Sequence, residues 1–119
     1  MAHQAGYVLV VADDATLRRR LPRELEREGF GVYVAHGVSD ALELAKEIPP
    51  RAVVLDLFHG SEDAWRRIKP AINGSRLIVA GKFTTASVAE RMHPDAYVAN
   101  GDVAEIIQAL RSLNGAHPV

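Results

Sequence analysis

The sequence predicts an α/β protein in which helices cover both faces of a parallel β-sheet. Short apolar runs alternate with segments of helical periodicity along most of the 119 residues, a pattern typical of a parallel sheet. The first run, Tyr7–Ala12, is apolar on both faces, as a central parallel strand should be. The next segment places Leu17, Leu21 and Leu25 at four-residue intervals, which gives a helix one apolar stripe.

The other elements follow from the same two patterns, and Asp14 and Gly29 are suited to begin and end the first helix. We expect strands at Tyr7–Ala12, Val32–Val34, Ala52–Leu55, Leu77–Ala80 and Ala96–Ala99. We expect helices at about Ala15–Glu28, at Ser39–Ile48, from about Ala64 to Pro70, from Thr84 or Thr85 to about Met92, and from Asp102 to Leu113, with a loop at Phe58–Asp63. Because right-handed crossovers leave few topologies, we predict the flavodoxin-like strand order 2-1-3-4-5. In that order, ligands bind at the carboxyl ends of the first and third strands.

The composition is that of one globular domain. With 48% hydrophobic and 24% charged residues, the chain has room for one core. We expect a single domain over residues 1–119, with a core at about 7–113 and loose ends at 1–6 and 114–119. The net charge of −1 offers no basic surface for nucleic acid, and the lack of cysteine excludes disulfides and thiolate metal sites. Every apolar run is strand-length, so we expect a protein that does not bind a membrane. We also expect it to be cytoplasmic and, from its net charge, not to bind nucleic acid.

Three aspartates follow the first and third predicted strands. Asp13 and Asp14 end the first strand and Asp56 ends the third, so the predicted order brings all three to one edge of the sheet. Carboxylates this close repel one another, and a hard cation such as Mg²⁺ would relieve that repulsion. Asp56 would then be a nucleophile that accepts a phosphoryl group. The simpler alternative is that Asp14 only caps a helix and Asp13 is a second cap or a solvated acid.

The segments around these acids resemble the receiver domains of two-component response regulators. The resemblance covers about residues 7–113 and is carried by Val8–Asp14, Arg18-Arg19, Leu25–Phe30, Ala41–Leu44, Val53–Leu57 and Asp95–Val98. It implies that a histidine kinase phosphorylates Asp56. It also implies that Asp13, Asp14 and the backbone carbonyl of Phe58 hold Mg²⁺, and that the chain is a signalling module and not an enzyme.

Three positions depart from the family's pattern. The first of the family's two strand-end acids falls on Ala12, its switch threonine or serine on Gly81, and its lysine after the fifth strand on Asn100. The site therefore lacks the hydroxyl that senses a phosphoryl group and the cation that neutralises its charge. Lys82 is a candidate substitute cation, although a solvated loop lysine is the simpler interpretation.

Aromatic residues complete the resemblance. Tyr97 matches the aromatic side chain that changes rotamer in many family members, with a purely structural tyrosine as the alternative. Phe58 and Phe83 fall at positions that flank the family's site, and large apolar groups there should slow the attack of water on a phosphoryl group. The family's shared partner and homodimer surface falls within residues 85–113, on Thr85–Met92, Tyr97 and Asp102–Leu113.

These observations support two main hypotheses for the function. The first is an atypical receiver in phosphorelay signalling that acts through protein contacts, with phosphorylation and Mg²⁺ binding weak or absent. The second is a phosphoaccepting single-domain regulator that uses Asp56 and Mg²⁺ in the usual way and needs Lys82 as its cation. Both expect a histidine kinase or another signalling protein as the partner. A third, a small-molecule-binding domain of the same fold, lacks a glycine-rich phosphate loop after the first strand.

Overall fold

The structure is a computed structural model that describes residues 6–72 and 74–113, and it confirms the predicted α/β fold. Five parallel strands form one sheet in the flavodoxin-like order β2-β1-β3-β4-β5. The strands are β1 (Tyr7–Ala12), β2 (Gly31–Val34), β3 (Ala52–Asp56), β4 (Arg76–Gly81) and β5 (Ala96–Ala99). The expectation of loose chain ends concerns segments that, apart from Gly6, lie outside the described residues.

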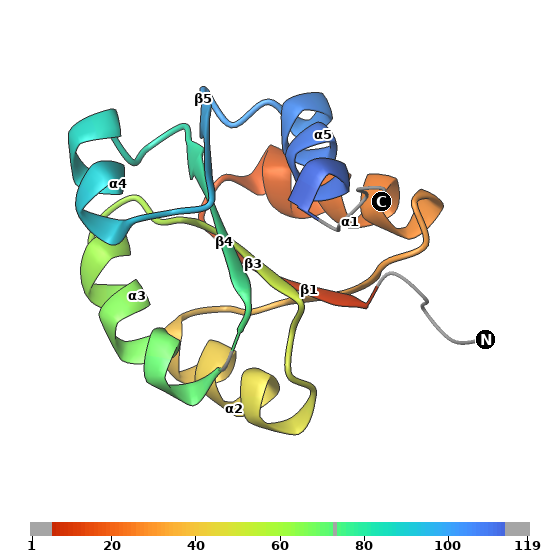
Figure 1. Ribbon diagram of the computed structural model, residues 1–119, viewed down its shortest axis with the longest axis horizontal. Coiled ribbons are helices and arrows are strands. Elements are labelled where there is room, and N and C mark those ends of the chain that lie inside the picture. Colours follow the sequence, from red (N-terminus) through yellow and green to blue (C-terminus); the bar gives the residue numbers. More distant parts are fainter. Residues whose placement is uncertain (1–5, 73, 114–119) are drawn as a thin grey trace.

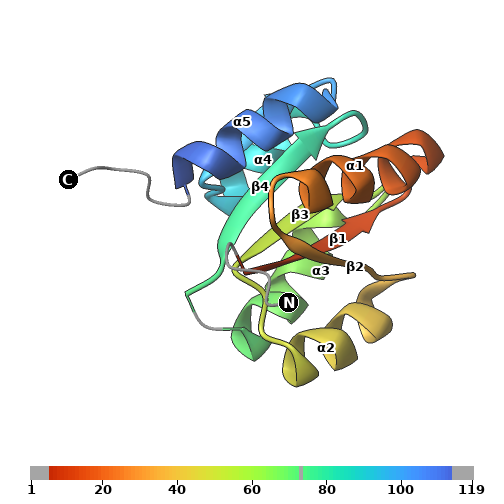
Figure 2. The same cartoon turned by 90° about the vertical axis from the view of Figure 1, so that its right-hand side faces the viewer.

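Helices cover the two faces of the sheet unequally. Helices α1 (Ala15–Arg27) and α5 (Val103–Leu113) lie on one face (Figure 1). On the other face lie α2 (Val38–Glu47), α3 (Ser61–Ile68) and α4 (Ala86–Met92), with a short 3₁₀ turn, η1 (Lys69–Ala71), after α3 (Figure 1). Figure 2 shows α2 and α3 on the side of the sheet away from α1 and α5. Within the described ranges, no helix combines the length and the apolar character that a membrane span requires.

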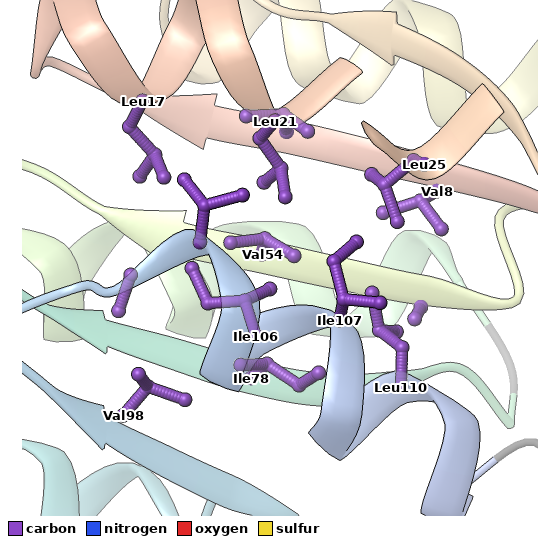
Figure 3. Close-up of a cluster of buried hydrophobic side chains, with 14 of the residues drawn as sticks. Val8, Leu17, Leu21, Leu25, Val54, Ile78, Val98, Ile106, Ile107 and Leu110 are labelled. Carbon is purple, nitrogen blue, oxygen red and sulfur yellow. The ribbon is translucent and has the colours of Figure 1, made fainter. Parts of the chain in front are cut away.

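The sheet separates two apolar cores, because every central strand is buried on both faces. On one side, the leucine stripe of α1 meets Ile106, Ile107 and Leu110 of α5 above the sheet (Figure 3). Side chains of β1, β3 and β4, among them Val8 and Val54, form the floor of that core. On the other side, α2, α3 and α4 pack on the alternate residues of the same strands. The two cores hold the carboxyl ends of the strands in fixed register.

Helix α3 begins at Ser61, three residues before the expected start at about Ala64, so the loop after β3 is shorter than predicted. Gly60 turns the chain with a left-handed φ of 80°, which glycine adopts at little cost. The amide of Ala64 then donates to the carbonyl of Gly60 at 2.9 Å, which closes the first turn. The hydroxyl of Ser61 accepts a hydrogen bond from the amide of Leu57 at 2.8 Å, which joins the start of the helix to the end of β3.

Side-chain caps set the starts of three helices near the carboxyl edge of the sheet. The side chain of Asp14 accepts a hydrogen bond from the amide of Leu17 at 2.9 Å, as the sequence predicts for a cap of α1. The side chain of Asp102 accepts a hydrogen bond from the amide of Glu105 at 3.3 Å at the start of α5. Of the two threonines considered for α4, Thr85 is the cap, which leaves the hydroxyl of Thr84 for another partner.

We predict that Leu21→Ala lowers the free energy of unfolding by about 2–5 kcal/mol, because it leaves a cavity in a fully buried site between α1 and the sheet. Urea denaturation followed by circular dichroism measures this change. The matched control is Arg19→Ala on the exposed side of the same helix, for which we expect a change within about 0.5 kcal/mol. Equal losses from the two variants would contradict the assignment of the core.

Candidate functional site

The candidate site is built around Asp56, the last residue of β3. Its side chain has no exposed surface, although strands of this kind usually end in solvent-facing loops. Residue Ala12 of β1 stands beside it in register, and the amide of Asp13 donates to the Asp56 carbonyl at 3.1 Å. A buried carboxylate is costly unless the protein supplies hydrogen-bond donors.

The loop between β4 and α4 supplies those donors. The hydroxyl and the amide of Thr84 donate to Oδ1 of Asp56 at 2.7 and 2.9 Å. The amide of Phe83 is shared between the two carboxylate oxygens, at 3.2 Å from Oδ1 and 3.1 Å from Oδ2. Three donor groups of two consecutive residues therefore bind both oxygens of the carboxylate.

Burial dominates the electrostatics of Asp56. It raises the pKa of the Asp56 carboxyl, and the hydrogen bonds from the Thr84 side chain and the loop amides oppose only part of that rise. Among the ion pairs of the described residues, none includes Asp56. The carboxylate is thus held by dipoles and not by a neighbouring cation.

The site includes two buried hydroxyl groups, and the sequence analysis identified neither of them. Thr84 and Ser61 are each 4% exposed, and their hydroxyl oxygens lie 2.8 Å apart. Together with Asp56 they are the buried polar side chains of the described residues, and they form one connected network. The available signal was the pair Thr84-Thr85, because only one of two adjacent threonines can cap α4.

The three aspartates lie at one edge of the sheet, but each serves a different partner. Asp13 is exposed, and its side chain accepts a hydrogen bond from the amide of Phe58 at 2.7 Å. Asp14 caps α1 with one oxygen, while its other oxygen lies 3.6 Å from Nζ of Lys82. Within residues 6–72 and 74–113, no three acidic or histidine side chains are placed to hold a metal ion.

The positions that depart from the expected pattern have structural roles here. Ala12 is buried at the end of β1, where an acid would be expected. Asn100 and Gly101 form a tight turn after β5 with left-handed φ angles of 68° and 62°, a conformation that Asn and Gly tolerate best. The amide of Asn100 donates to the carbonyl of Gly81 at 3.3 Å, so this turn ties the ends of β4 and β5 together.

Two further predicted residues lie on either side of the loop after β4. The hydroxyl of Tyr97 donates to the carbonyl of Thr84 at 3.0 Å, so Tyr97 is linked to Asp56 through one residue. Phe58 is 61% exposed, and its ring meets that of Phe83 edge to face, with centroids 5.2 Å apart. The aromatic pair thus connects the loops that follow β3 and β4.

Comparison with known proteins agrees with this fold. No family model matches the chain. The acid tolerance regulatory protein ActR of Sinorhizobium medicae is 34% identical over 110 residues, which are 87% of this chain and 57% of that protein. A putative NtrX-like response regulator of Rickettsia conorii is 41% identical over 56 residues, 46% of this chain and 12% of that protein. The chain thus spans little more than half the length of the first relative.

Solved structures of response regulators are similar over nearly the whole chain. A response regulator from Burkholderia pseudomallei, solved with a phosphorylated aspartic acid, a calcium ion and citrate, has a TM-score of 0.76 and 25% identity; the match covers 91% of this chain and 68% of that one. One from Thermotoga maritima has a TM-score of 0.80 at 17% identity, with 92% and 98% of the two chains covered. The second likeness concerns the fold alone.

We predict that Asp56→Asn raises the free energy of unfolding at neutral pH by about 1 kcal/mol, because it removes a charge that is buried without a cation. Folding raises the pKa of Asp56, so its contribution to stability is fully present below the unfolded value of 3.8 and is lost as pH rises through the folded value. The gain from the substitution should therefore shrink as the pH falls to about 3, where both states bind the proton.

Thermal unfolding of the two proteins across this pH range measures the effect. The control is Asp63→Asn, which removes an exposed carboxylate from α3 and should show no comparable gain. A lower stability of Asp56→Asn at neutral pH would contradict the prediction, because it would mean that the loop donors more than compensate for burial.

Proposed function

The chain belongs to the receiver domains of two-component response regulators, and on that premise we propose that it is an atypical receiver. It signals through contacts with other proteins, and phosphorylation of Asp56 is weak or absent. The observation that carries this proposal is the carboxylate of Asp56, which is fully buried and has both oxygens bound by the loop after β4.

Access to the nucleophile supports the proposal. Phosphoryl transfer requires a carboxylate oxygen in line with the phosphorus atom and space for the incoming group. Asp56 offers no exposed surface, and Thr84 and Phe83 bind its oxygens on the side of the loop. The loop has to move away before a phosphoryl donor reaches Asp56.

Charge compensation supports it as well. A transferred phosphoryl group is stabilised chiefly by cations around its oxygens. In this chain, Lys82 pairs with Asp14, and Asp13 binds the amide of Phe58. The calcium ion of the Burkholderia pseudomallei structure accompanies a phosphorylated aspartic acid in that protein. Here the candidate metal ligands have other partners, which favours weak or absent binding of Mg²⁺.

The proposed contact surface lies on the side of α4, β5 and α5. A groove of about 750 Å³ runs between α4 and β5 and is lined by Ala86, Ser87, Ala89, Glu90, His93, Pro94, Asp95, Ala96 and Tyr97. Tyr97 also bonds to Thr84, so the groove and the surroundings of Asp56 share one side chain. We propose that a histidine kinase, another signalling protein or a second copy of the chain binds here.

The second candidate function is a receiver that accepts phosphate at Asp56 in the ordinary way. One observation favours it: Lys82 lies at the same edge of the sheet, with its ammonium group 3.6 Å from Asp14 and half exposed to solvent. A phosphoryl group on Asp56 would give this lysine a second anionic partner if the loop opened. The two functions differ in the extent of phosphorylation.

We predict that incubation with acetyl phosphate and Mg²⁺ leaves most of the wild-type protein without a phosphoryl adduct, as measured by intact mass. The reason is that the loop donors would have to be displaced before Asp56 can attack phosphorus and release acetate. Asp56→Ala and Lys82→Ala serve as controls. An adduct on most wild-type molecules that is lost in both variants would contradict the proposal and favour the second function.

For any fraction that does become phosphorylated, we predict slow hydrolysis. The rings of Phe58 and Phe83 lie beside the loops around Asp56 and hinder an attacking water. Replacing both rings by alanine should shorten the lifetime of the adduct. The lifetime is measured as the decay of the phosphorylated mass after acetyl phosphate is removed. Trp65→Phe, in the buried part of α3, is a control for general loosening of the fold. An unchanged lifetime in the double variant would contradict this role of the rings.

A further inference from the structure

A small cavity lies between the start of α1 and the end of the edge strand β2. It has a volume of about 360 Å³ and is lined by Ala15, Arg18, Arg19, Val34 and His36. Two of these side chains are guanidinium groups, one is an imidazole, and none is acidic. Arg19 and His36 are exposed, so the cavity opens to solvent. Its size suits a small ligand, and its charge favours an anion.

The guanidinium group of Arg18 is positioned at this cavity by a neutral partner. Its Nη2 atom lies 2.9 Å from Nδ1 of His36. Because a guanidinium only donates hydrogen bonds, the ring nitrogen is the acceptor, and the imidazole is assigned the tautomer with its hydrogen on Nε2. Among the ion pairs of residues 6–72 and 74–113, none includes Arg18 or Arg19. His36 therefore orients Arg18 and leaves its positive charge uncompensated.

This lack of acidic partners contrasts with the arginines of other surfaces. Five arginines pair with an aspartate or a glutamate, namely Arg27, Arg66, Arg76, Arg91 and Arg111. The first turn of α1 contains no acid, and the consecutive arginines Arg18, Arg19 and Arg20 follow it. Cations stabilise a helix near its carboxyl end and not near its amino end, so the helix itself gains little from these charges.

Two acids stand next to the cavity, and each has another partner. Asp14 caps α1 and pairs with Lys82. Asp40 accepts a hydrogen bond from the backbone amide of His36 at 2.9 Å. Neither acid lines the cavity. A guanidinium group has five N–H donors, so Arg18 retains donors for an anion from outside the chain after it has bound His36.

We propose that this space, the α1–β2 cavity, binds the phosphate group of a small phosphate monoester. The guanidinium groups of Arg18 and Arg19 bind the phosphate oxygens, and His36 is a positioning residue for Arg18. One carboxylate engages one guanidinium fork, whereas the three terminal oxygens of a phosphate group can engage two. The site goes beyond the proposed function, because its ligand binds without any phosphorylation of Asp56.

The test is a titration of the full chain with inorganic phosphate, followed by NMR of the backbone amides at constant ionic strength, which keeps screening fixed. We expect saturable shifts centred on Arg18, Arg19 and His36. Sodium acetate, which carries a single carboxylate, should bind about tenfold more weakly. Glycerol phosphate, a small monoester, should bind at least as tightly as inorganic phosphate, because the cavity has room for the ester group.

Variants of exposed or half-exposed side chains locate the site. Arg18→Gln should raise the dissociation constant for phosphate about tenfold, as expected for the loss of a charged donor. The matched control is Arg23→Gln, which removes the same charge from an exposed position of α1 outside the cavity. It should change the constant less than about twofold, because distant surface charges are screened.

Two further variants separate geometry from charge. Arg18→Lys keeps the charge and loses the planar fork, so it should weaken phosphate binding severalfold. His36→Ala removes the group that orients Arg18, and it should weaken binding about threefold, in line with one neutral hydrogen bond.

Several results would overturn the site. They are the absence of saturable shifts at the cavity, equal losses from Arg18→Gln and Arg23→Gln, and full affinity in Arg18→Lys. Acetate binding as tight as phosphate binding, or loss of affinity for the ester, would overturn the assignment to a phosphate monoester.

The outcome is independent of phosphorylation at Asp56. Inorganic phosphate is not a phosphoryl donor, and the groups that donate hydrogen bonds to Asp56 belong to Phe83 and Thr84, outside the α1–β2 cavity. Complete phosphorylation by acetyl phosphate would refute the proposed function and leave the anion site standing, whereas a failed titration would leave the phosphorylation result untouched.

Discussion

A carboxylate without solvent has to find its hydrogen bonds inside the protein, and this requirement organises the carboxyl edge of the sheet. Asp56 finds three donor groups in two consecutive residues, Phe83 and Thr84, so the loop after β4 is held against the end of β3. The start of α3 is drawn into the same network through Ser61. Removing the charge from solvent thus ties together two loops that are more than twenty residues apart in the sequence.

At the same edge, acidic residues stand at the ends of β1 and β3, as the resemblance implies, and the acids after β1 bind groups of this chain. Asp13 binds a backbone amide, and Asp14 caps a helix and pairs with Lys82. Each of these two aspartates therefore has a partner within the chain. In the proposed function, the site is a structural junction that keeps the geometry of a receiver and presents a protein-binding face.

The fold was predictable because its signals are local and repeated. The apolar strand runs, the leucine stripe of α1 and the cap at Asp14 are each visible within a few residues, and the cap of α4 was narrowed to Thr84 or Thr85. The start of α3 was misplaced because a left-handed Gly60 begins the helix earlier than the apolar spacing indicates. The role of Thr84 was missed for a different reason. Alignment placed the expected hydroxyl at Gly81, and linear spacing does not reveal that the next loop folds back onto Asp56.

Strand β5 has a partner on one side only and contains four residues, so it is the less secured end of the sheet next to the site. Edge strands of this length open locally at a lower free energy than the central strands they adjoin. Because Tyr97 belongs to β5, transient fraying of this edge would withdraw its hydroxyl from the loop while β1, β3 and β4 stayed paired. The time for which the loop stays over Asp56 would therefore depend on how often this edge strand opens and not only on the stability of the whole fold.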